Sequence, residues 1–168
     1  MIGASCNSIA APRILLVDQA GELGGALFDE RPYEAELRAF AAEAGVADRV
    51  HFLGFRDDVA RPMRAADVVP HTSIASEPFG RVIVEGMLAG KPVIATAAGA
   101  ALEIIEDGVT GVLVPPDGAA ALSSAILKLL SRAGSNVDIG RGAMEVAGRR
   151  FSLATTLDAI DAVIRSRQ

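Results

Sequence analysis

The sequence has few of the residues on which disulfide and metal chemistry depend. Its 168 residues include one cysteine, no tryptophan and two histidines. Cys6 alone cannot form an internal disulfide and has no metal-ligand spacing around it, which suits a reducing cytoplasm. His51 and His71 lack partner ligands, and the chain has no Asp-x-Asp pair of the kind that holds a metal-bound diphosphate. We therefore expect no metal or other cofactor.

Aromatic residues and positive charge are also scarce. Aromatic residues make up 4% of the chain and the formal net charge is −5. A nucleic-acid surface would need stacking rings or a basic patch, so we expect no nucleic-acid partner. Residues 1–11 lack the basic start and apolar core of a signal peptide, and no apolar run approaches a transmembrane length. These features predict a cytoplasmic protein, which could also act at the inner membrane surface.

What the chain does contain is an alternation of short apolar runs with helical segments. Strands are predicted at 13–18, 50–53, 68–71, 92–96 and 110–114, and helices at 32–44, 59–66, 81–89, 102–106, 119–130, 137–149 and 153–167. Asp117 and Ser152 are candidate N-caps for two of these helices. The alternation predicts an α/β fold, a Rossmann-like parallel sheet with flanking helices and C-terminal helices packing on the sheet.

Residues 71–96 form the most informative stretch, which reads as a loop, a helix and a strand. Glu77-Pro-Phe-Gly80 predicts a turn whose last residue can open the helix. The backbone N–H groups of Phe79, Gly80 and Arg81 would face the space above the helix N-terminus, where the helix dipole favours negative charge. This space suits a phosphorylated or hydroxyl-rich ligand.

Two carboxylates, Glu77 and Glu85, bracket the start of this helix. Carboxylates repel phosphate but accept hydrogen bonds from vicinal hydroxyls, so Glu85 could hold a ribose and Glu77 a transferred sugar. The same spacing fits an N-terminal charge preference and a solvated helix face. The spacing by itself leaves both interpretations open.

Two other glycine-rich segments do not complete a nucleotide-binding motif. The segment 86–91 has one spacer residue fewer than a Walker phosphate loop, and Pro92 stands where a magnesium-binding hydroxyl is needed. Gly140 and Gly142 begin a G-x-G pattern, but Glu145 occupies the position of its third glycine. Neither segment therefore predicts a phosphate site.

The segment 77–96 resembles the Glu-x7-Glu signature of family 4 retaining glycosyltransferases of the two-domain GT-B type. The segments 47–59, 64–68, 103–116 and 151–152 are similar to consecutive parts of the donor-binding domain of these enzymes. From about residue 26 to the C-terminus the resemblance is continuous. It implies one half of a GT-B fold that recognises a nucleotide-diphosphate sugar, and transfer of a hexose with retention of configuration.

The resemblance also implies roles for individual residues. Glu77, as the catalytic residue, is expected to contact the transferred sugar, and Glu85 to hold the ribose. The other implied donor-binding residues are Phe79, Gly80 and Arg81 at the helix start and Gly54, Phe55 and Arg56 beside the base. A core aromatic at position 55 and a solvated charge at position 56 remain alternatives. Retention in such enzymes is discussed as front-face substitution, in which the leaving phosphate takes the acceptor proton and no protein nucleophile is needed.

The N-terminal part of the chain departs from the family pattern. A complete enzyme begins with an acceptor-binding domain, and its donor domain opens with a strand and a loop that carries a basic pair. Residues 13–25 instead look like the opening strand and glycine-rich loop of an acceptor domain. One hypothesis is an internal deletion joined near residues 24–26, with 1–25 an acceptor-domain remnant and 26–168 the donor-binding domain. The alternative is an ordinary donor-domain strand with a variable loop.

The missing half has consequences for activity. A GT-B active site lies between two domains, so we expect a truncated chain that is incomplete by itself and needs an acceptor domain or subunit in trans. Exposed apolar surface would then favour self-association. The alternative function is a non-catalytic or vestigial module that binds a nucleotide sugar.

Overall fold

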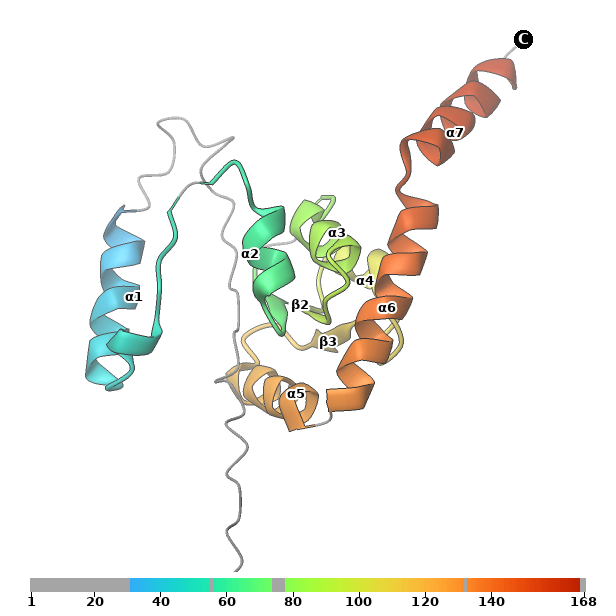
Figure 1. The fold of residues 1–168 in the computed structure, drawn as a ribbon. Helices are drawn as coiled ribbons and strands as arrows, with labels where there is room; N and C mark the ends of the chain where they lie inside the picture. The colour runs from blue at the N-terminus through green and yellow to red at the C-terminus, as the bar shows by residue number, and fades with distance from the viewer. Residues whose placement is uncertain (1–30, 55, 74–77, 132, 167–168) are drawn as a thin grey trace, which may run out of the picture. The chain divides into compact units, whose positions relative to one another are not determined.

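The computed structural model describes residues 31–54, 56–73, 78–131 and 133–166, which belong to two compact units. The smaller unit is described from residue 31 to Val59. It contains α1 (Arg31–Glu43) and a single 3-10 turn, η1 (Ala47–Arg49). The larger unit, described from Ala60 onward, contains the sheet and the remaining helices (Figure 1). The predicted strand at 13–18 and the proposed boundary at 25–26 lie outside the described residues, so both stay predictions.

In the smaller unit, α1 is confirmed and the predicted strand at 50–53 is wrong. Gly45 ends the helix with a φ of 67°, which a glycine adopts without strain. Residues 50–54 have no regular structure and pair with none of the described strands. An apolar run becomes a strand only when a neighbouring strand supplies backbone hydrogen bonds, and periodicity does not reveal that neighbour.

The larger unit is built on three parallel strands, β1 (Val69–His71), β2 (Val93–Thr96) and β3 (Val112–Val114), in the spatial order β1-β2-β3. Val69 pairs with Val93 and Ile94 with Val112. The predictions at 68–71, 92–96 and 110–114 are therefore confirmed with slightly shorter bounds. Parallel pairing places the C-terminal ends of all three strands at one edge of the sheet.

Successive strand residues point to opposite faces of the sheet and supply two hydrophobic clusters. On one face Val69, Val93 and Ala95 pack with residues of α3, α4 and α6. On the other face Val68 and Ile94 pack with α5. The helices of this unit are α2 (Ala60–Ala65), α3 (Arg81–Leu88), α4 (Ala101–Ile104), α5 (Ala119–Ser131), α6 (Ala133–Arg150) and α7 (Leu153–Arg165). The parallel α/β architecture predicted from the alternation is confirmed.

Two helix N-termini differ in how well the sequence predicts them. Ser152 caps α7 as expected, because its Oγ accepts a hydrogen bond from the Thr155 N–H at 3.0 Å. Asp117 does not cap α5: it has a φ of 55°, and the carbonyl of the next residue, Gly118, accepts the first helical hydrogen bond from Leu122 at 2.9 Å. The turn after Pro115 and Pro116 therefore moves the N-cap by one residue.

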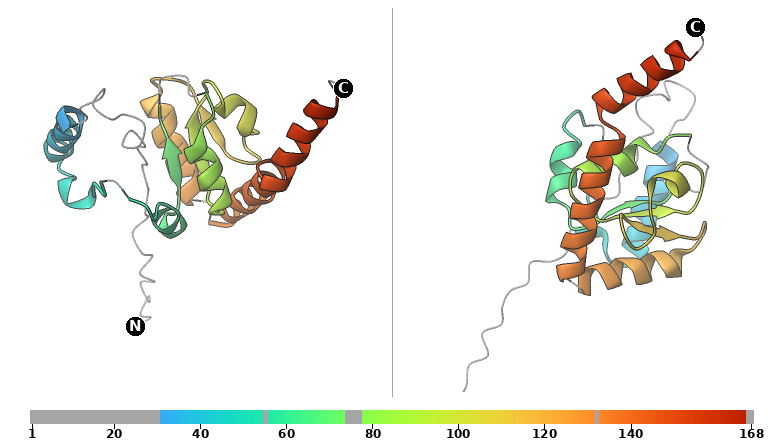
Figure 2. Two further views of the ribbon diagram at one scale, coloured as in Figure 1. Left: turned by 90° about the horizontal axis from the view of Figure 1, so that it is seen from above. Right: turned by 90° about the vertical axis from the view of Figure 1, so that its right-hand side faces the viewer.

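The expectation that the C-terminal helices pack on the sheet holds for α6 but not for α7. Ala143 and Ala147 of α6 are buried in the cluster that contains Val93. Every residue of α7 is exposed, and the helix extends beyond the rest of its unit (Figure 2). The described part of this unit offers no surface that covers its apolar side chains. None of the described helices has the length and apolarity of a membrane span.

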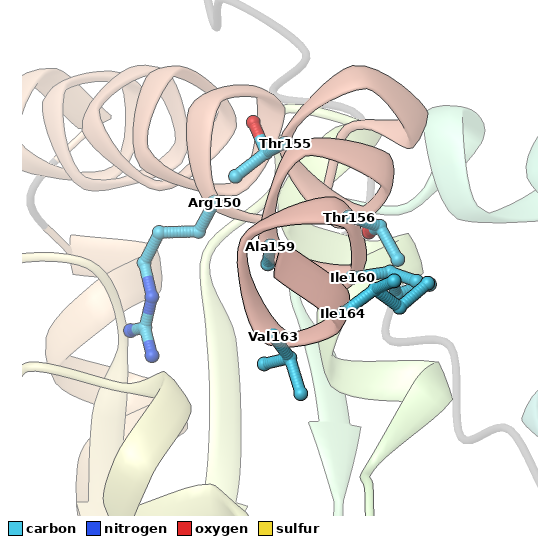
Figure 3. Close-up of a pocket in the computed structure, with 7 residues that line it drawn as sticks. All are labelled: Arg150, Thr155, Thr156, Ala159, Ile160, Val163 and Ile164. Carbon is cyan, nitrogen blue, oxygen red and sulfur yellow. The ribbon is translucent and has the colours of Figure 1, made fainter. Parts of the chain in front are cut away.

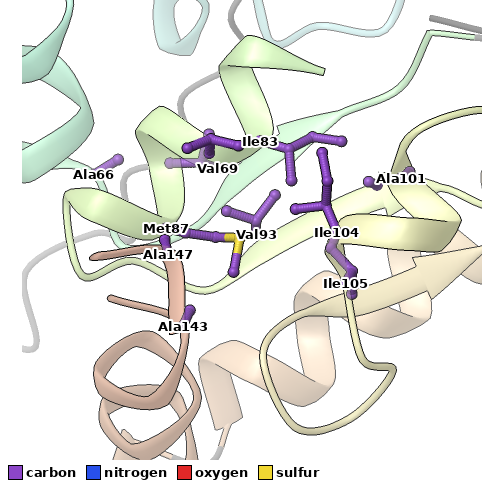
Figure 4. Close-up of a cluster of buried hydrophobic side chains, with 12 residues drawn as sticks. Ala66, Val69, Ile83, Met87, Val93, Ala101, Ile104, Ile105, Ala143 and Ala147 are labelled. Atoms are coloured by element: carbon purple, nitrogen blue, oxygen red, sulfur yellow. The ribbon is translucent and has the colours of Figure 1, made fainter. Parts of the chain in front are cut away.

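The helix α3 fits between the sheet and α6 because two glycines lie at the contacts. A Cβ on Gly86 would lie 2.8 Å from Val93 Cγ2, and one on Gly140 of α6 would lie 2.3 Å from the carbonyl oxygen of Gly90. The side chains of Ile83 and Met87 belong to the buried cluster that α3 shares with the sheet and α6 (Figure 4). Complete burial of a side chain such as Met87 contributes about 1.5–3 kcal/mol.

The close approach at Gly140 gives a testable prediction. Gly140→Ala forces backbone away from backbone, so we expect it to lower the free energy of unfolding by about 1–3 kcal/mol. Gly148→Ala, in the same helix, meets nothing within 4 Å and should raise stability by up to about 1 kcal/mol through helix propensity. Urea denaturation of both variants measures the difference, and equal stability would contradict the packing argument.

Candidate functional site

The candidate site lies at the edge of the sheet where the parallel strands end. His71 and Thr96 are the last residues of β1 and β2, and both are buried, with 9% and 6% of their surface exposed. The chain continues from β1 through residues 72–80 into α3, which returns along the sheet toward the start of β2. The N-terminus of α3 therefore stands at the edge where ligands of parallel sheets bind.

Gly80 is the N-cap of α3 and has a backbone conformation suited to glycine. Its φ and ψ are 72° and 48°, and its carbonyl accepts hydrogen bonds from the N–H groups of Ile83 and Val84. A Cβ at this position would lie 3.1 Å from Ile83 Cδ1 and 3.4 Å from Ile104 Cδ1. Because Gly80 carries no side chain, the chain can turn sharply into the helix, whose first N–H groups have no intrahelical acceptor.

Phe79 is held by its ring rather than buried. Its side chain is 55% exposed, and its ring meets the ring of Phe151 edge to face, with centroids 6.1 Å apart and an interplanar angle of 82°. Phe151 follows α6 and packs against the cluster that contains Ile104. The predicted role of Phe79 rests on its backbone, and the ring beside that backbone contacts Phe151.

Arg81 and Glu85 lie one turn apart at the start of α3 and form an ion pair. Arg81 Nε is 3.4 Å from Glu85 Oε1, and the two side chains are 56% and 36% exposed. A carboxylate has about four acceptor positions, more than this one contact uses. The pair also reduces the local negative charge, which a phosphate bound nearby would otherwise meet.

Gly54 and Arg56 belong to the smaller unit, where Arg56 forms hydrogen bonds with Asp58. Arg56 donates from Nε and Nη2 to the two carboxylate oxygens of Asp58 at 2.7 and 2.8 Å. This hydrogen bond and the charge of Asp58 raise the pKa of Arg56 above its usual value. Gly54 has a φ of 63° and nothing within 4 Å of an added Cβ. Arg56 therefore has a carboxylate partner in the structure. From the sequence alone, a solvated charge at this position was an alternative interpretation.

Four of the predicted residues lie together in the larger unit, Gly54 and Arg56 belong to the smaller unit, and the remaining two are not described. Phe79, Gly80, Arg81 and Glu85 share the start of α3. Glu77 and Phe55 lie outside the described residues. A segment that the sequence analysis did not assign to the site, the turn 97–100 with Gly99 at a φ of 53°, follows β2 at the same edge. Its position after a parallel strand is the signal that could have identified it.

No metal-ligand group accompanies this site in the part of the chain that the structure describes. Residues 31–54, 56–73, 78–131 and 133–166 contain no group of three His, Cys, Asp or Glu side chains that could hold a metal ion. A pocket of about 490 Å³ lies along α7 (Figure 3). Its lining is mostly apolar and consists of Arg150, Thr155, Thr156, Ala159, Ile160, Val163 and Ile164.

Comparisons with known proteins agree on one family. The family model described as glycosyl transferases group 1 matches residues 14–146. Over 99 residues the chain is 42% identical to a phosphatidyl-myo-inositol mannosyltransferase of Mycobacterium leprae, covering 58% of this chain and 26% of that protein. Over 150 residues it is 37% identical to a D-inositol 3-phosphate glycosyltransferase of Mycobacteroides abscessus, covering 88% of this chain and 32% of that protein.

A solved structure adds a ligand to the comparison. The fold is similar to that of Anabaena HepE in complex with UDP and glucose, with a TM-score of 0.81 and 41% identity. The match covers 92% of this chain and 40% of HepE. HepE has also been solved in complex with UDP-glucose. The chain therefore spans well under half the length of these relatives.

Proposed function

Because the chain belongs to the group 1 family of glycosyltransferases, we propose that it binds a nucleotide-diphosphate sugar as the donor part of such an enzyme. The observation that carries the proposal is the start of α3, where Gly80 opens the helix at the strand edge and Glu85 lies one turn further on. The helix N-terminus suits a diphosphate, and the carboxylate suits a ribose. The UDP and UDP-glucose complexes of HepE support this class of ligand.

Each part of the site has a distinct role in this proposal. The N–H groups of the loop at 79–81 bind the diphosphate, and the Glu85 carboxylate accepts hydrogen bonds from the ribose hydroxyls. Glu77 contacts the transferred hexose. Arg81, paired with Glu85 at 3.4 Å, orients that carboxylate and adds positive charge beside the phosphates. Gly54 and the residues that follow it line the base.

Transfer proceeds with retention of configuration and without a metal ion in this proposal. The developing charge on the leaving diphosphate is stabilised by N–H groups already fixed in direction by the helix. The leaving phosphate accepts the proton of the attacking hydroxyl, so the protein positions the substrates and supplies no nucleophile. The acceptor is bound by a second domain or subunit.

A calorimetric titration with UDP-, GDP- and ADP-sugars tests donor binding. Replacing Glu85 by Gln keeps the shape but weakens hydrogen bonds to the charged carboxylate, so we expect Kd to rise about 10- to 100-fold. Stability should change by less than about 1 kcal/mol, because the pair with Arg81 is solvent-exposed.

The matched control is Asp138→Asn, which removes a carboxylate from another exposed helical ion pair, with Arg141 at 2.9 Å. This variant should bind the donor as the wild type does. If the wild type binds none of the three nucleotide sugars, or if Glu85→Gln binds as tightly, the proposed donor site is wrong.

The second candidate function, for these 168 residues by themselves, is donor binding without catalysis. The chain matches about a third of the curated relatives' length, and an acceptor needs a surface opposite Glu77. We expect radiolabelled transfer from a bound donor only when an acceptor domain of a relative is added. Transfer by the chain alone would exclude the binding-module function; donor binding without transfer in either case would favour it.

We also propose that the chain associates with itself through the apolar face of α7. Leu157, Ile160 and Ile164 lie on one side of this helix and are 54%, 51% and 57% exposed. Size-exclusion chromatography should show an oligomer whose fraction rises with concentration and falls in Ile160→Lys. Ala162→Lys adds the same charge on the opposite side of the helix and should leave the elution unchanged. A wild-type monomer at all concentrations would contradict the proposal.

A further inference from the structure

Three segments that are distant in the sequence meet beside the start of α3. They are the loop at 78–80, the C-terminal end of α4 and the junction 150–152 between α6 and α7. The Phe79 and Phe151 rings contact each other edge to face at a centroid distance of 6.1 Å. This arrangement is favourable because the positive ring edge faces the negative ring face.

The Phe151 ring is fixed from a second direction by the residue before it. The Cζ atom of Arg150 lies 5.2 Å from the centroid of the Phe151 ring, within the range of a cation–π contact. Nη1 of the same guanidinium donates to the carbonyl oxygen of Glu103 in α4 at 3.0 Å. The Phe151 ring that contacts Phe79 is therefore linked through Arg150 to both α6 and α4.

The same α4 segment also borders the space where a side chain at position 80 would lie. Ile104, the residue after Glu103, is 5% exposed, and its Cδ1 lies 3.4 Å from where a Gly80 Cβ would stand. Phe151 packs against the cluster that includes Ile104. Phe151 therefore contacts the ring of Phe79, Ile104 occupies the space beside Gly80, and Arg150 links Phe151 to α4.

From this arrangement we propose that Phe151 is a positioning residue for the donor site. Its ring holds Phe79, and so fixes the direction of the N–H groups at 79–81 before a ligand arrives. This role rests on the proposed donor-binding function. A site whose donors are fixed in advance loses less conformational freedom on binding, so a loosened loop binds the same donor more weakly.

The test replaces the Phe151 ring by a smaller apolar side chain, which still packs against the hydrophobic cluster. Phe151→Leu keeps an apolar side chain but removes the edge-to-face contact, and we expect the Kd for the nucleotide sugar to rise about two- to tenfold, the range of aromatic pair energies. Phe79→Leu should have a similar effect, and the two losses should not add in the double variant, because one contact is removed in each case. Phe151→Tyr retains an aromatic ring and should bind the nucleotide sugar with the Kd of the wild type.

Amide hydrogen exchange provides a readout that needs no ligand. The N–H groups of Ile83 and Val84 donate to the Gly80 carbonyl, so a loosened loop should increase their exchange about two- to tenfold in Phe151→Leu. Phe40→Leu is the matched control, since it makes the same change at a residue of α1 that is 70% exposed. It should change neither exchange nor affinity.

The outcomes separate this role from the donor-binding function. Wild-type protein that binds no nucleotide sugar overturns the function, while the exchange rates still decide whether Phe151 positions the loop. Unchanged exchange and unchanged affinity in Phe151→Leu overturn the positioning role. Additive losses in the double variant also overturn it, because independent effects would mean that the ring contact does not link the two residues.

Discussion

The parallel pairing of β1, β2 and β3 determines where every part of the candidate site can lie. Val69 opposite Val93 and Ile94 opposite Val112 bring the three strand ends to one edge. Each strand is followed by a loop and a helix, so the starts of α3, α4 and α5 gather at that edge as well. The alternation of side chains then requires a buried layer on both faces, which α3 and α6 supply on one side and α5 on the other.

The site on this framework combines a closely packed backbone at Gly80 with exposed side chains at Arg81 and Glu85. Gly80 is buried and tightly packed, whereas Arg81 and Glu85 are partly open to solvent. This combination suits a ligand bound by the N–H groups of a helix start and by one carboxylate. The chain belongs to the group 1 glycosyltransferases. This membership is consistent with such a ligand.

Sequence reasoning located the elements that carry a local signal. Gly80 before an apolar helix and Gly90 after it gave the bounds of α3 to within one residue. The predicted strand at 50–53 was wrong because a strand depends on a partner that the run itself does not specify. Neither the edge contact between Phe79 and Phe151 nor the hydrogen bond from Arg150 to Glu103 has a local pattern, because each joins residues far apart in the chain.

The glycines at positions 86 and 140 have a consequence for the depth of the site. Gly86 lies where α3 contacts Val93 of the sheet. Gly140 lies where α6 contacts Gly90, in the turn that follows α3. With backbone close to its neighbours at both places, α3 has little freedom to slide along its own axis. The height of its N-terminus above the strand ends therefore depends on packing at two residues that lie away from that N-terminus. A redesign that raises or lowers the start of α3 would therefore begin at those positions.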